Sequence, residues 1–201
     1  MTVALLVKNL SSAVAGPFEL SLDKGTCAAI TGPSGSGKSV FLRMIADLDP
    51  NDGEVWLNES ARAAMPAPAW RRQVMYVPAE SGWWANTVVQ HFPADQHGEL
   101  TALAARLGLR SDILDAPIRE LSTGEKQRLS LIRALLLQSP VLLLDEPTGP
   151  LDEDSTAAVE TILRERMAGG TSVVLVTHNP SQADRLGHQR YRMVARRLEK
   201  P

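Results

Sequence analysis

The residues with the clearest chemical meaning form a glycine-rich loop near the start of the chain. The stretch GPSGSGKS, residues 32–39, fits the pattern G-x-x-x-x-G-K-[ST] between an apolar run and a segment of helical periodicity. Its glycines let backbone N–H groups converge on one centre, where the N-terminus of the following helix adds partial positive charge. Lys38 can reach the β- and γ-phosphates of a nucleoside triphosphate, and Ser39 can ligate Mg²⁺. The loop therefore predicts triphosphate binding, and the alternatives are a plain strand-to-helix turn or a small nucleotide kinase.

Two adjacent carboxylates follow an apolar run later in the chain. The run VLLLDEP, residues 141–147, predicts a strand buried on both faces of a parallel sheet, with Asp145 and Glu146 at its end. Carboxylates there are costly to bury unless they meet a cation or water. A Mg²⁺-nucleotide site supplies both, because Asp145 can hold Mg²⁺ and Glu146 can face an attacking water. The alternative is a strand end whose acids merely face solvent.

A third motif, LSTGEKQR at residues 121–128, precedes the apolar-periodic segment 129–137. Ser122, Thr123 and Gly124 lie just before this expected helix, so the motif predicts a second helix N-terminus suited to binding an anion. One chain rarely needs two such sites for one γ-phosphate. The simplest interpretation is that this loop serves a nucleotide held by another subunit.

These motifs together resemble those of the ATP-binding cassette (ABC) ATPases. LSTGE is similar to the LSGGQ signature of that family, and the family order is kept: GPSGSGKS, LSTGEKQR, VLLLDEP, then GPLD at 149–152 and VLVTH at 174–178. The resemblance covers nearly the whole chain. It implies an α/β fold, with a P-loop NTPase (RecA-like) core, an N-terminal antiparallel β subdomain and a short inserted helical subdomain. A single domain of residues 1–201 is expected, with its core at about 1–79 and 122–201 and its helical subdomain at about 80–121.

The resemblance also implies roles for the residues of one nucleotide site, with ATP and Mg²⁺ as its ligands. Residues that would bind the nucleotide are Gly32, Pro33, Ser34, Gly35, Ser36, Gly37, Lys38, Ser39 and Val40. Asp145 would complete the Mg²⁺ shell begun by Ser39, and Glu146 would act as general base or orient the attacking water. His178 would contact the γ-phosphate, although a lone His after a strand often only packs or caps.

The family pattern further implies a homodimer in the presence of ATP. Ser122 and Gly124 would contact the γ-phosphate held by the opposing subunit, and Asp152 would communicate across the dimer. A nucleotide kinase has no reason to carry LSTGE or a His at the end of the strand that follows DEP.

Four positions depart from the family pattern. The Gln expected after residues 74–77 is replaced by Ala79, which cannot ligate Mg²⁺, and the side chain of the adjacent Glu80 would leave a strand on the opposite face. The aromatic residue expected to stack on adenine is replaced by Val14, and Phe18 comes too late; such stacking is worth roughly 1 kcal/mol. Thr123 and Glu125 in the signature are smaller changes.

Composition limits the class of protein. The chain has 201 residues, 44% of them hydrophobic, which suits one domain with a sizeable core. Its net charge of −2 argues against electrostatic binding of nucleic acid. The single cysteine, Cys27, fits a packing role in a reducing compartment. No signal peptide or membrane-spanning segment is expected, so a transport channel would be a separate chain.

The apolar patterns predict the order of the elements. Expected strands are residues 3–7, 18–22, 26–30, 54–57, 74–77, 141–145 and 171–176, with a last strand in the basic tail. Expected helices are residues 39–46, 129–137 and 155–167, with helical periodicity at 100–107. If Trp83 and Trp84 lie in an extended segment, one ring faces inward and the other outward. The outward ring would line the groove that receives a membrane subunit; packing of both rings under the helical subdomain is the alternative.

The sequence therefore predicts the ATPase subunit of a bacterial-type ABC transporter, a homodimer on the cytoplasmic face of the cell membrane beneath a separate permease. A soluble ABC ATPase without transport is the alternative, with a nucleotide kinase behind it. The segments ELSTGEKQRLSLIRALL, VLLLDEPTGPLDE and VLVTHNPSQADR most resemble compact bacterial iron-export-type cassettes. Haem and lipoprotein export systems are alternatives within the family, and the sequence leaves substrate and transport direction open.

Overall fold

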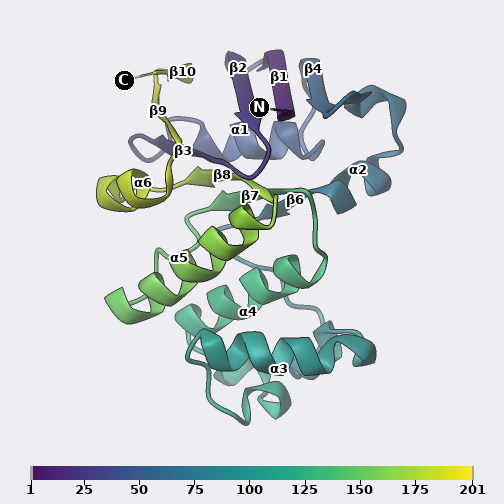
Figure 1. Ribbon diagram of the computed structural model, residues 1–201, viewed down its shortest axis with the longest axis vertical. Helices are drawn as coiled ribbons and strands as arrows, with labels where there is room; N and C mark the ends of the chain where they lie inside the picture. Colours follow the sequence, from purple (N-terminus) through teal and green to yellow (C-terminus); the bar gives the residue numbers. More distant parts are fainter. Residues whose placement is uncertain (1, 201) are drawn as a thin grey trace.

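Two β-sheets lie in the upper part of the molecule and the three longest helices lie below them, as Figure 1 shows for the computed structural model, which describes residues 2–200. The first sheet is antiparallel, with strand order β2-β1-β4-β5. Its strands are β1 (Val3–Ser12), β2 (Ala15–Asp23), β4 (Asp52–Leu57) and β5 (Ser60–Ala61). Apolar side chains alternate along β2, so one face of this sheet is buried and the other meets solvent.

The second sheet has the strand order β10-β9-β3-β8-β7-β6. Its strands are β3 (Cys27–Thr31), β6 (Val74–Val77), β7 (Val141–Asp145), β8 (Ser172–Val176), β9 (Gln189–Val194) and β10 (Arg197–Glu199). All neighbours are parallel except β10, which pairs antiparallel with β9. Parallel pairing places the carboxyl ends of β3, β7 and β8 at one edge, and the segments that follow these strands carry the motif residues.

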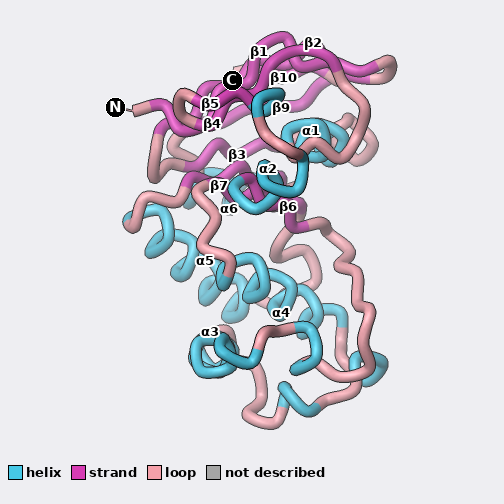
Figure 2. Tube along the Cα trace, turned by 90° about the vertical axis from the view of Figure 1, so that its right-hand side faces the viewer, coloured by secondary structure: helices cyan, strands magenta, loops and turns pink. Residues whose placement is uncertain are grey.

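This second sheet is the middle layer of the fold, since both its faces are covered (Figure 2). Every residue of β7 and β8 is buried, as the apolar runs predict. On one face, Val141, Leu143 and Val174 pack with helix α1 (Lys38–Ile45) and the antiparallel sheet. On the other face, Leu142 and Leu144 pack in a cluster with the lower helices. Helix α1 therefore lies between the two sheets, which fixes the loop before it in space.

The lower helices share one apolar cluster with the sheet. They are α3 (His97–Arg106), α4 (Thr123–Leu136) and α5 (Glu153–Ala168), and α6 (Pro180–Leu186) packs at the same face. Segment 80–121 contributes α3 and the short 3₁₀ turns Val89–His91, Ala94–Gln96, Ile113–Asp115 and Ile118–Glu120. Leu100 of α3 and Leu107, the residue after this helix, join Leu129 and Leu142 in the same cluster. The division into core and helical subdomain stays a prediction.

Several elements differ from the sequence-based expectation. Strand 74–77 is correct at both ends, and α4 begins at Thr123, inside the motif that was expected to lie just before this helix. The tail forms a hairpin of two strands, β9 and β10, where one strand was expected. Helix α2 (Ala67–Gln73), the 3₁₀ turn Arg62–Ala64 and α6 were not predicted. Helix α2 is held by Trp70, whose buried Nε1–H donates to the Ile45 carbonyl at 2.9 Å, a long-range contact with no local signal.

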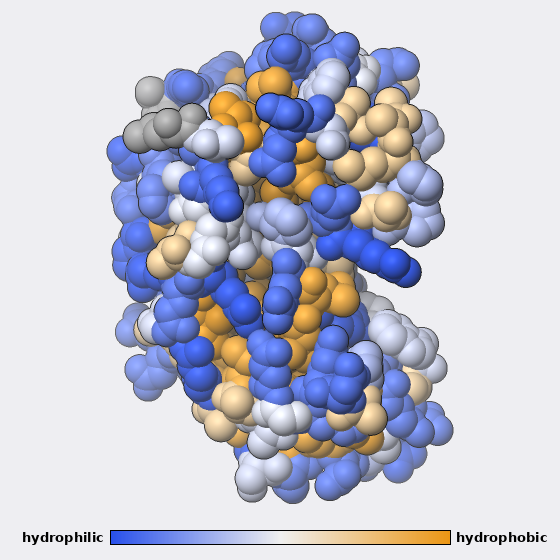
Figure 3. Space-filling view, turned by 45° about the vertical axis from the view of Figure 1, so that its right-hand side comes forward, coloured by the Kyte–Doolittle hydropathy of each residue, from blue (hydrophilic) through white to orange (hydrophobic). Residues whose placement is uncertain are grey.

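The surface suits a globular protein, and the single thiol, that of Cys27, suits a packing role. Within residues 2–200, no helix combines the length and the apolar character needed to cross a bilayer. Figure 3 shows hydrophobic residues at the surface mainly in the lower half of the molecule, interspersed with hydrophilic ones.

Cys27 is fully buried, and burial raises the pKa of its thiol to about 12. The thiol is therefore unreactive at neutral pH and fills space in the core.

Candidate nucleotide-binding site

The glycine-rich loop connects β3 to α1 and adopts a conformation that only glycine accepts easily. Gly32, Gly35 and Gly37 have φ values of 152°, 74° and 104°. A Cβ on Gly32 would lie 2.6 Å from the Met193 carbonyl oxygen, so no larger residue fits there. Gly37 is the N-cap of α1 and supplies no side-chain hydrogen bond to the helix. The first N–H groups of α1 are therefore available to an anion.

Lys38 follows these glycines and lies folded over the loop. Its Nζ donates to the Gly32 carbonyl at 2.8 Å and the Pro33 carbonyl at 2.9 Å, and the residue is buried. Two backbone carbonyls thus hold the ammonium in the pocket beside the loop. A phosphate bound at the α1 N-terminus would lie next to this positive charge.

Asp145 ends β7 and is the most enclosed acid of the site, with 4% of its surface exposed. Its Oδ2 accepts a hydrogen bond from the Tyr76 hydroxyl at 3.0 Å. Burial raises the pKa of Tyr76, and the neighbouring Asp145 carboxylate raises it further. Tyr76 therefore stays a neutral donor that orients the carboxylate. Sequence reasoning did not single out Tyr76, because the contact joins two strands 69 residues apart.

Glu146 follows β7 but does not continue the strand. Its φ of 49° lies in the left-handed region, while its N–H donates to the Val176 carbonyl at 2.9 Å. This uncommon conformation turns the carboxylate toward His178. The His178 Nδ1–H donates to Glu146 Oε2 at 2.7 Å, and the His178 backbone N–H donates to the same oxygen at 3.1 Å. Strain of this kind occurs often at functional sites.

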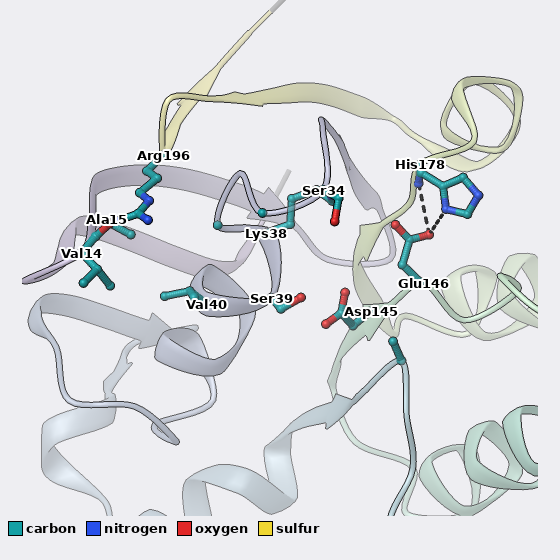
Figure 4. Close-up of a pocket in the computed structure, with 13 residues that line it drawn as sticks. Val14, Ala15, Ser34, Lys38, Ser39, Val40, Asp145, Glu146, His178 and Arg196 are labelled. Carbon is teal, nitrogen blue, oxygen red and sulfur yellow. Dashed lines mark hydrogen bonds and ion pairs between the residues drawn. The ribbon is translucent and has the colours of Figure 1, made fainter.

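The two residues of this pair differ in exposure: the His178 side chain is 70% exposed and the Glu146 side chain is 22% exposed. In Figure 4 the imidazole lies beyond the Glu146 carboxylate as seen from Ser39. His178 thus holds the carboxylate in this structure, and its predicted contact with a γ-phosphate stays a prediction.

One pocket of about 450 Å³ gathers most of the predicted site residues (Figure 4). The predicted residues that line it are Ser34, Gly35, Gly37, Lys38, Ser39, Val40, Asp145, Glu146 and His178. The oxygens of Ser39 and Asp145 face the same space. Hard oxygen donors of this kind suit Mg²⁺, which is usually held by one or two protein ligands together with phosphate and water. The remaining loop residues, Gly32, Pro33 and Ser36, form the loop behind the lining.

Ser122 and Gly124 lie at the start of α4 and do not line this pocket. Ser122 is the N-cap of α4: its Oγ accepts from the Glu125 N–H at 3.2 Å, and Glu125 Oε2 accepts from the Ser122 N–H at 2.9 Å. The Ser122 hydroxyl also donates to Glu125 Oε2 at 2.9 Å. Burial alone would raise the pKa of Glu125, but the Ser122 hydrogen bonds and nearby Arg110 and Arg128 lower it overall. Glu125 is therefore a carboxylate at neutral pH.

Asp152 caps the next helix, α5, and borders a second cavity. Its Oδ1 accepts from the Ser155 N–H at 2.7 Å. The cavity, about 720 Å³, also touches Glu146 and His178 on one side. A Cβ on Gly124 would lie 3.2 Å from Leu151 Cδ2, so the signature motif packs closely against the GPLD segment. The two motifs assigned to the dimer therefore adjoin each other.

Two positions that depart from the family pattern, Ala79 and Val14, line the pocket, whereas the aromatic and acidic residues near them in the sequence do not. Ala79 lines the pocket at the end of β6, whereas Glu80 is exposed and is not part of the lining. Val14 lines the opposite end and is 54% exposed. Phe18 is buried against Phe41, with ring centroids 4.7 Å apart, so it does not reach the pocket. Arg196, which sequence reasoning passed over, lies beside Val14 in the same pocket.

The tryptophan pair lies in an irregular segment after β6. Trp83 packs against the lower apolar cluster, whereas Trp84 is 70% exposed. Both rings contact His91, and the Arg133 guanidinium lies 5.0 Å from the Trp83 ring centre and 4.8 Å from that of Trp84. The interpretation with one inward and one outward ring is correct. These contacts hold Trp84 in place while leaving most of its surface open.

The chain matches a known protein family. Residues 16–149 match the family model described as ABC transporter. That range contains the phosphate loop, the signature motif and the two carboxylates at the end of β7.

Curated relatives and solved structures give similar matches. The chain is 35% identical over 195 residues to the lipoprotein-releasing system ATP-binding protein LolD 1 of Rhodopirellula baltica, covering 87% of this chain and 83% of that protein. It is also 35% identical over 188 residues to the pyoverdine export ATP-binding/permease protein PvdT of Pseudomonas syringae, covering 84% of this chain but only 28% of that longer protein. A structure described as the ATP binding subunit of an ABC transporter superimposes with a TM-score of 0.87 at 26% identity, covering 97% of this chain and 88% of that one.

Proposed function

This chain belongs to the ABC transporter family, and from that premise we propose that it hydrolyses ATP to energise a membrane permease formed by a separate subunit. One observation carries the proposal: a single pocket holds Lys38, Ser39, Asp145 and Glu146 around a glycine loop with free helix N–H groups. The match to LolD 1, which is described as an ATP-binding protein of a lipoprotein-releasing system, supports the proposal.

Binding of ATP follows from the charges of the pocket. The α1 N-terminus and Lys38 attract the phosphates, and Lys38 exchanges its two backbone carbonyl partners for phosphate oxygens. Ser39 and Asp145 are the residues that would hold Mg²⁺, while Tyr76 keeps the Asp145 carboxylate oriented. When bound, Mg²⁺ neutralises charge that develops on the phosphates during hydrolysis.

Glu146 is the residue proposed to activate water. The imidazole and the backbone N–H of His178 both hold the Glu146 carboxylate through its Oε2. Among the described residues, none forms a hydrogen bond with Oε1 of Glu146. Oε1 can therefore accept the proton of a water that attacks the γ-phosphate. Because this chemistry depends mostly on positioning and charge stabilisation, a carboxylate held by two donors is well suited to it.

Substituting Glu146→Gln tests this role. The amide is nearly isosteric but cannot take the proton, so turnover should fall at least about a hundredfold, as for loss of a general base. ATP binding should persist, and the variant should form an ATP-stabilised dimer that is visible by size-exclusion chromatography with light scattering. Turnover near that of the wild type would remove Glu146 from its role.

We further propose that Ser122, Gly124 and Asp152 act across a homodimer. They lie outside the pocket that holds Lys38, and their two motifs adjoin each other near Leu151. A second copy of the chain would present the start of its α4 to the open side of the pocket. The two copies would then enclose each nucleotide between the α1 N-terminus of one and the α4 N-terminus of the other.

The membrane partner is proposed to dock at Trp84, on the inner face of the cell membrane. The ring is large, amphipathic and exposed, and Trp84 belongs to the segment that follows β6 and starts in the nucleotide pocket at Ala79. Truncating an interface anchor commonly costs ~2 kcal/mol or more of binding free energy. Trp84→Ala should therefore weaken assembly with the permease while the isolated chain keeps its melting temperature. Normal assembly of this variant would exclude Trp84 as the anchor, and absence of any permease partner would favour a soluble ABC ATPase.

A further inference from the structure

The hairpin turn between β9 and β10 has a conformation that its residues do not favour. Ala195 and Arg196 have φ values of 46° and 62°, both in the left-handed region. Two-residue hairpin turns with this geometry strongly prefer Asn-Gly, Asp-Gly or Gly-Gly, because residues with a Cβ are strained there. A strained residue persists where the surrounding structure holds it, and such residues cluster at ligand sites.

The contacts of Arg196 explain how the turn is held. The Gly16 N–H donates to the Arg196 carbonyl at 3.2 Å, and Arg196 Nη1 donates to the Val14 carbonyl at 2.6 Å. The Arg196 Cγ lies 3.6 Å from where a Cβ on Gly37 would be. The side chain thus bridges the β1–β2 turn and the phosphate loop, over a sequence separation of 182 residues from Val14.

This bridge forms one end of the nucleotide pocket. In Figure 4 Arg196 lies beside Val14 and Ala15, at the end opposite Glu146 and His178, with Lys38 and Ser39 between them. A triphosphate that starts at Glu146 and passes Lys38 would bring its nucleoside toward Arg196. The surroundings there are apolar apart from the guanidinium, since Val14, Ala15 and Val40 line that end.

The chemistry of that end suits an aromatic base. Val14, Ala15 and Val40 offer no aromatic ring at that end, and the imidazole of His178 lies at the opposite end of the pocket. A guanidinium is planar, delocalised and weakly hydrated, and it stacks on aromatic faces, including those of bases. Its hydrogen bond to the Val14 carbonyl limits its freedom while Arg196 lines the pocket.

We propose that Arg196 supplies the face against which the purine base of the bound nucleotide stacks. The inference rests on the proposed binding of ATP in this pocket. It makes Arg196 a nucleotide-binding residue, and it assigns the adenine contact to the β9–β10 turn instead of the segment around Val14.

The test compares ATP with inorganic tripolyphosphate, which has the phosphates without the nucleoside. Arg196→Gly removes the side chain and places the residue that this turn prefers, so the melting temperature should stay equal or rise. Calorimetric titration with Mg²⁺ should show ATP binding weakened about tenfold, the range of a partly desolvated cation–π contact, with tripolyphosphate binding unchanged. Arg197→Ala, which removes a neighbouring exposed arginine of the same hairpin, should leave both affinities unchanged.

A second pair of variants separates stacking from charge. Arg196→Lys keeps the charge but loses the plane, so it should weaken ATP binding almost as much as the glycine variant. Val14→Tyr, added to Arg196→Gly, should restore ATP affinity, because it offers a ring at the same end of the pocket.

Three outcomes would overturn the inference. Equal losses for ATP and tripolyphosphate would assign Arg196 to the phosphates, and unchanged ATP affinity would make the side chain structural. Tighter ATP binding by Arg196→Gly would show that the guanidinium blocks the base. If the wild type binds neither ligand, the proposed ATP-binding function itself fails, a result that is distinct from the other three.

Discussion

The N-termini of helices α1 and α4 are both predicted to meet a γ-phosphate, yet they are built in opposite ways. Helix α1 starts after Gly37, has no side-chain cap and carries no acidic residue in its first turn. Helix α4 starts with a complete capping box between Ser122 and Glu125, so the N–H groups of these two residues have partners and its first turn carries a carboxylate. One terminus has no side-chain cap, and the other is capped and carries its own acid.

This difference suggests an order of events. The α1 terminus and Lys38 can bind a phosphate without any change elsewhere. In the proposed dimer, the α4 terminus would bring its Glu125 carboxylate toward a phosphate held by the other copy, so two anions would approach one helix end. Nucleotide binding by one chain should therefore be strong, and closure of the dimer should be the less favourable step.

The largest expected effect separates the two termini directly. Lys38→Ala should weaken ATP binding to the isolated chain about a hundredfold, the upper range for a charged hydrogen bond. Ser122→Ala should leave that affinity unchanged, although loss of the cap should lower stability by about 1 kcal/mol. Calorimetric titration at a concentration where the chain is monomeric measures both. Equal losses in affinity would mean that both termini serve one nucleotide in one chain.

Mixing these two variants asks whether the termini meet across a dimer. Each variant alone should hydrolyse ATP poorly, because every composite site lacks one partner. In a mixed dimer one site combines an intact Lys38 with an intact Ser122, so activity should return on mixing. ATPase rates per subunit should also rise with the concentration of wild-type protein. Activity strictly proportional to enzyme, without rescue, would argue for a self-sufficient monomer.

A smaller effect is expected when the acid at α4 is neutralised. Glu125→Gln keeps a residue able to complete the capping box but removes the charge. The ATP-driven dimer should become several times tighter at low ionic strength, and the gain should shrink in high salt because the repulsion is screened. Sedimentation at two salt concentrations measures the affinity of the dimer. A weaker dimer would show that the carboxylate helps closure.

The same variant has a defined pH dependence. The folded-state pKa of Glu125 lies below its ordinary value of 4.5, so the carboxylate stabilises the fold above pH 4.5 and this contribution is lost as the pH falls through the lower folded value. The melting temperature of the wild type relative to Glu125→Gln should therefore decline below pH 4.5. A difference that is constant across this range would contradict the assigned hydrogen bonds.

The smallest effect concerns the α1 pocket again. Ala79 lines it without a polar side chain, so Ala79→Gln would add an amide oxygen near the proposed Mg²⁺ position. Basal hydrolysis should rise modestly, or stimulation by the permease should strengthen, with ATP affinity nearly unchanged. Steady-state rates with and without the partner measure both. Rates that do not change would mean that another group already fills this role.

Much of the site could be predicted because its chemistry is carried by contiguous motifs. Residues 32–39 form the loop, Asp145 and Glu146 end β7, and Ser122 caps a helix, as their patterns indicate. The backbone turn at Glu146 was not predictable, since an L-residue with φ of 49° is an exception that the hydrogen bond to Val176 supports. For the same reason the hairpin at Ala195 and Arg196 was missed: these residues lack the glycine signal of such a turn.

Local sequence settles which residues can bind phosphate, since the spacing of Gly37, Lys38 and Ser39 leads to one loop shape wherever the loop is placed. Local sequence does not determine which distant residues contact the site. Tyr76 reaches Asp145 because β6 pairs with β7, and Arg196 reaches Val14 because the β9–β10 turn lies against the β1–β2 turn. Such contacts depend on the order of strands in the sheets and on how the sheets stack. That order comes from the packing energy of the whole core, which no short motif contains.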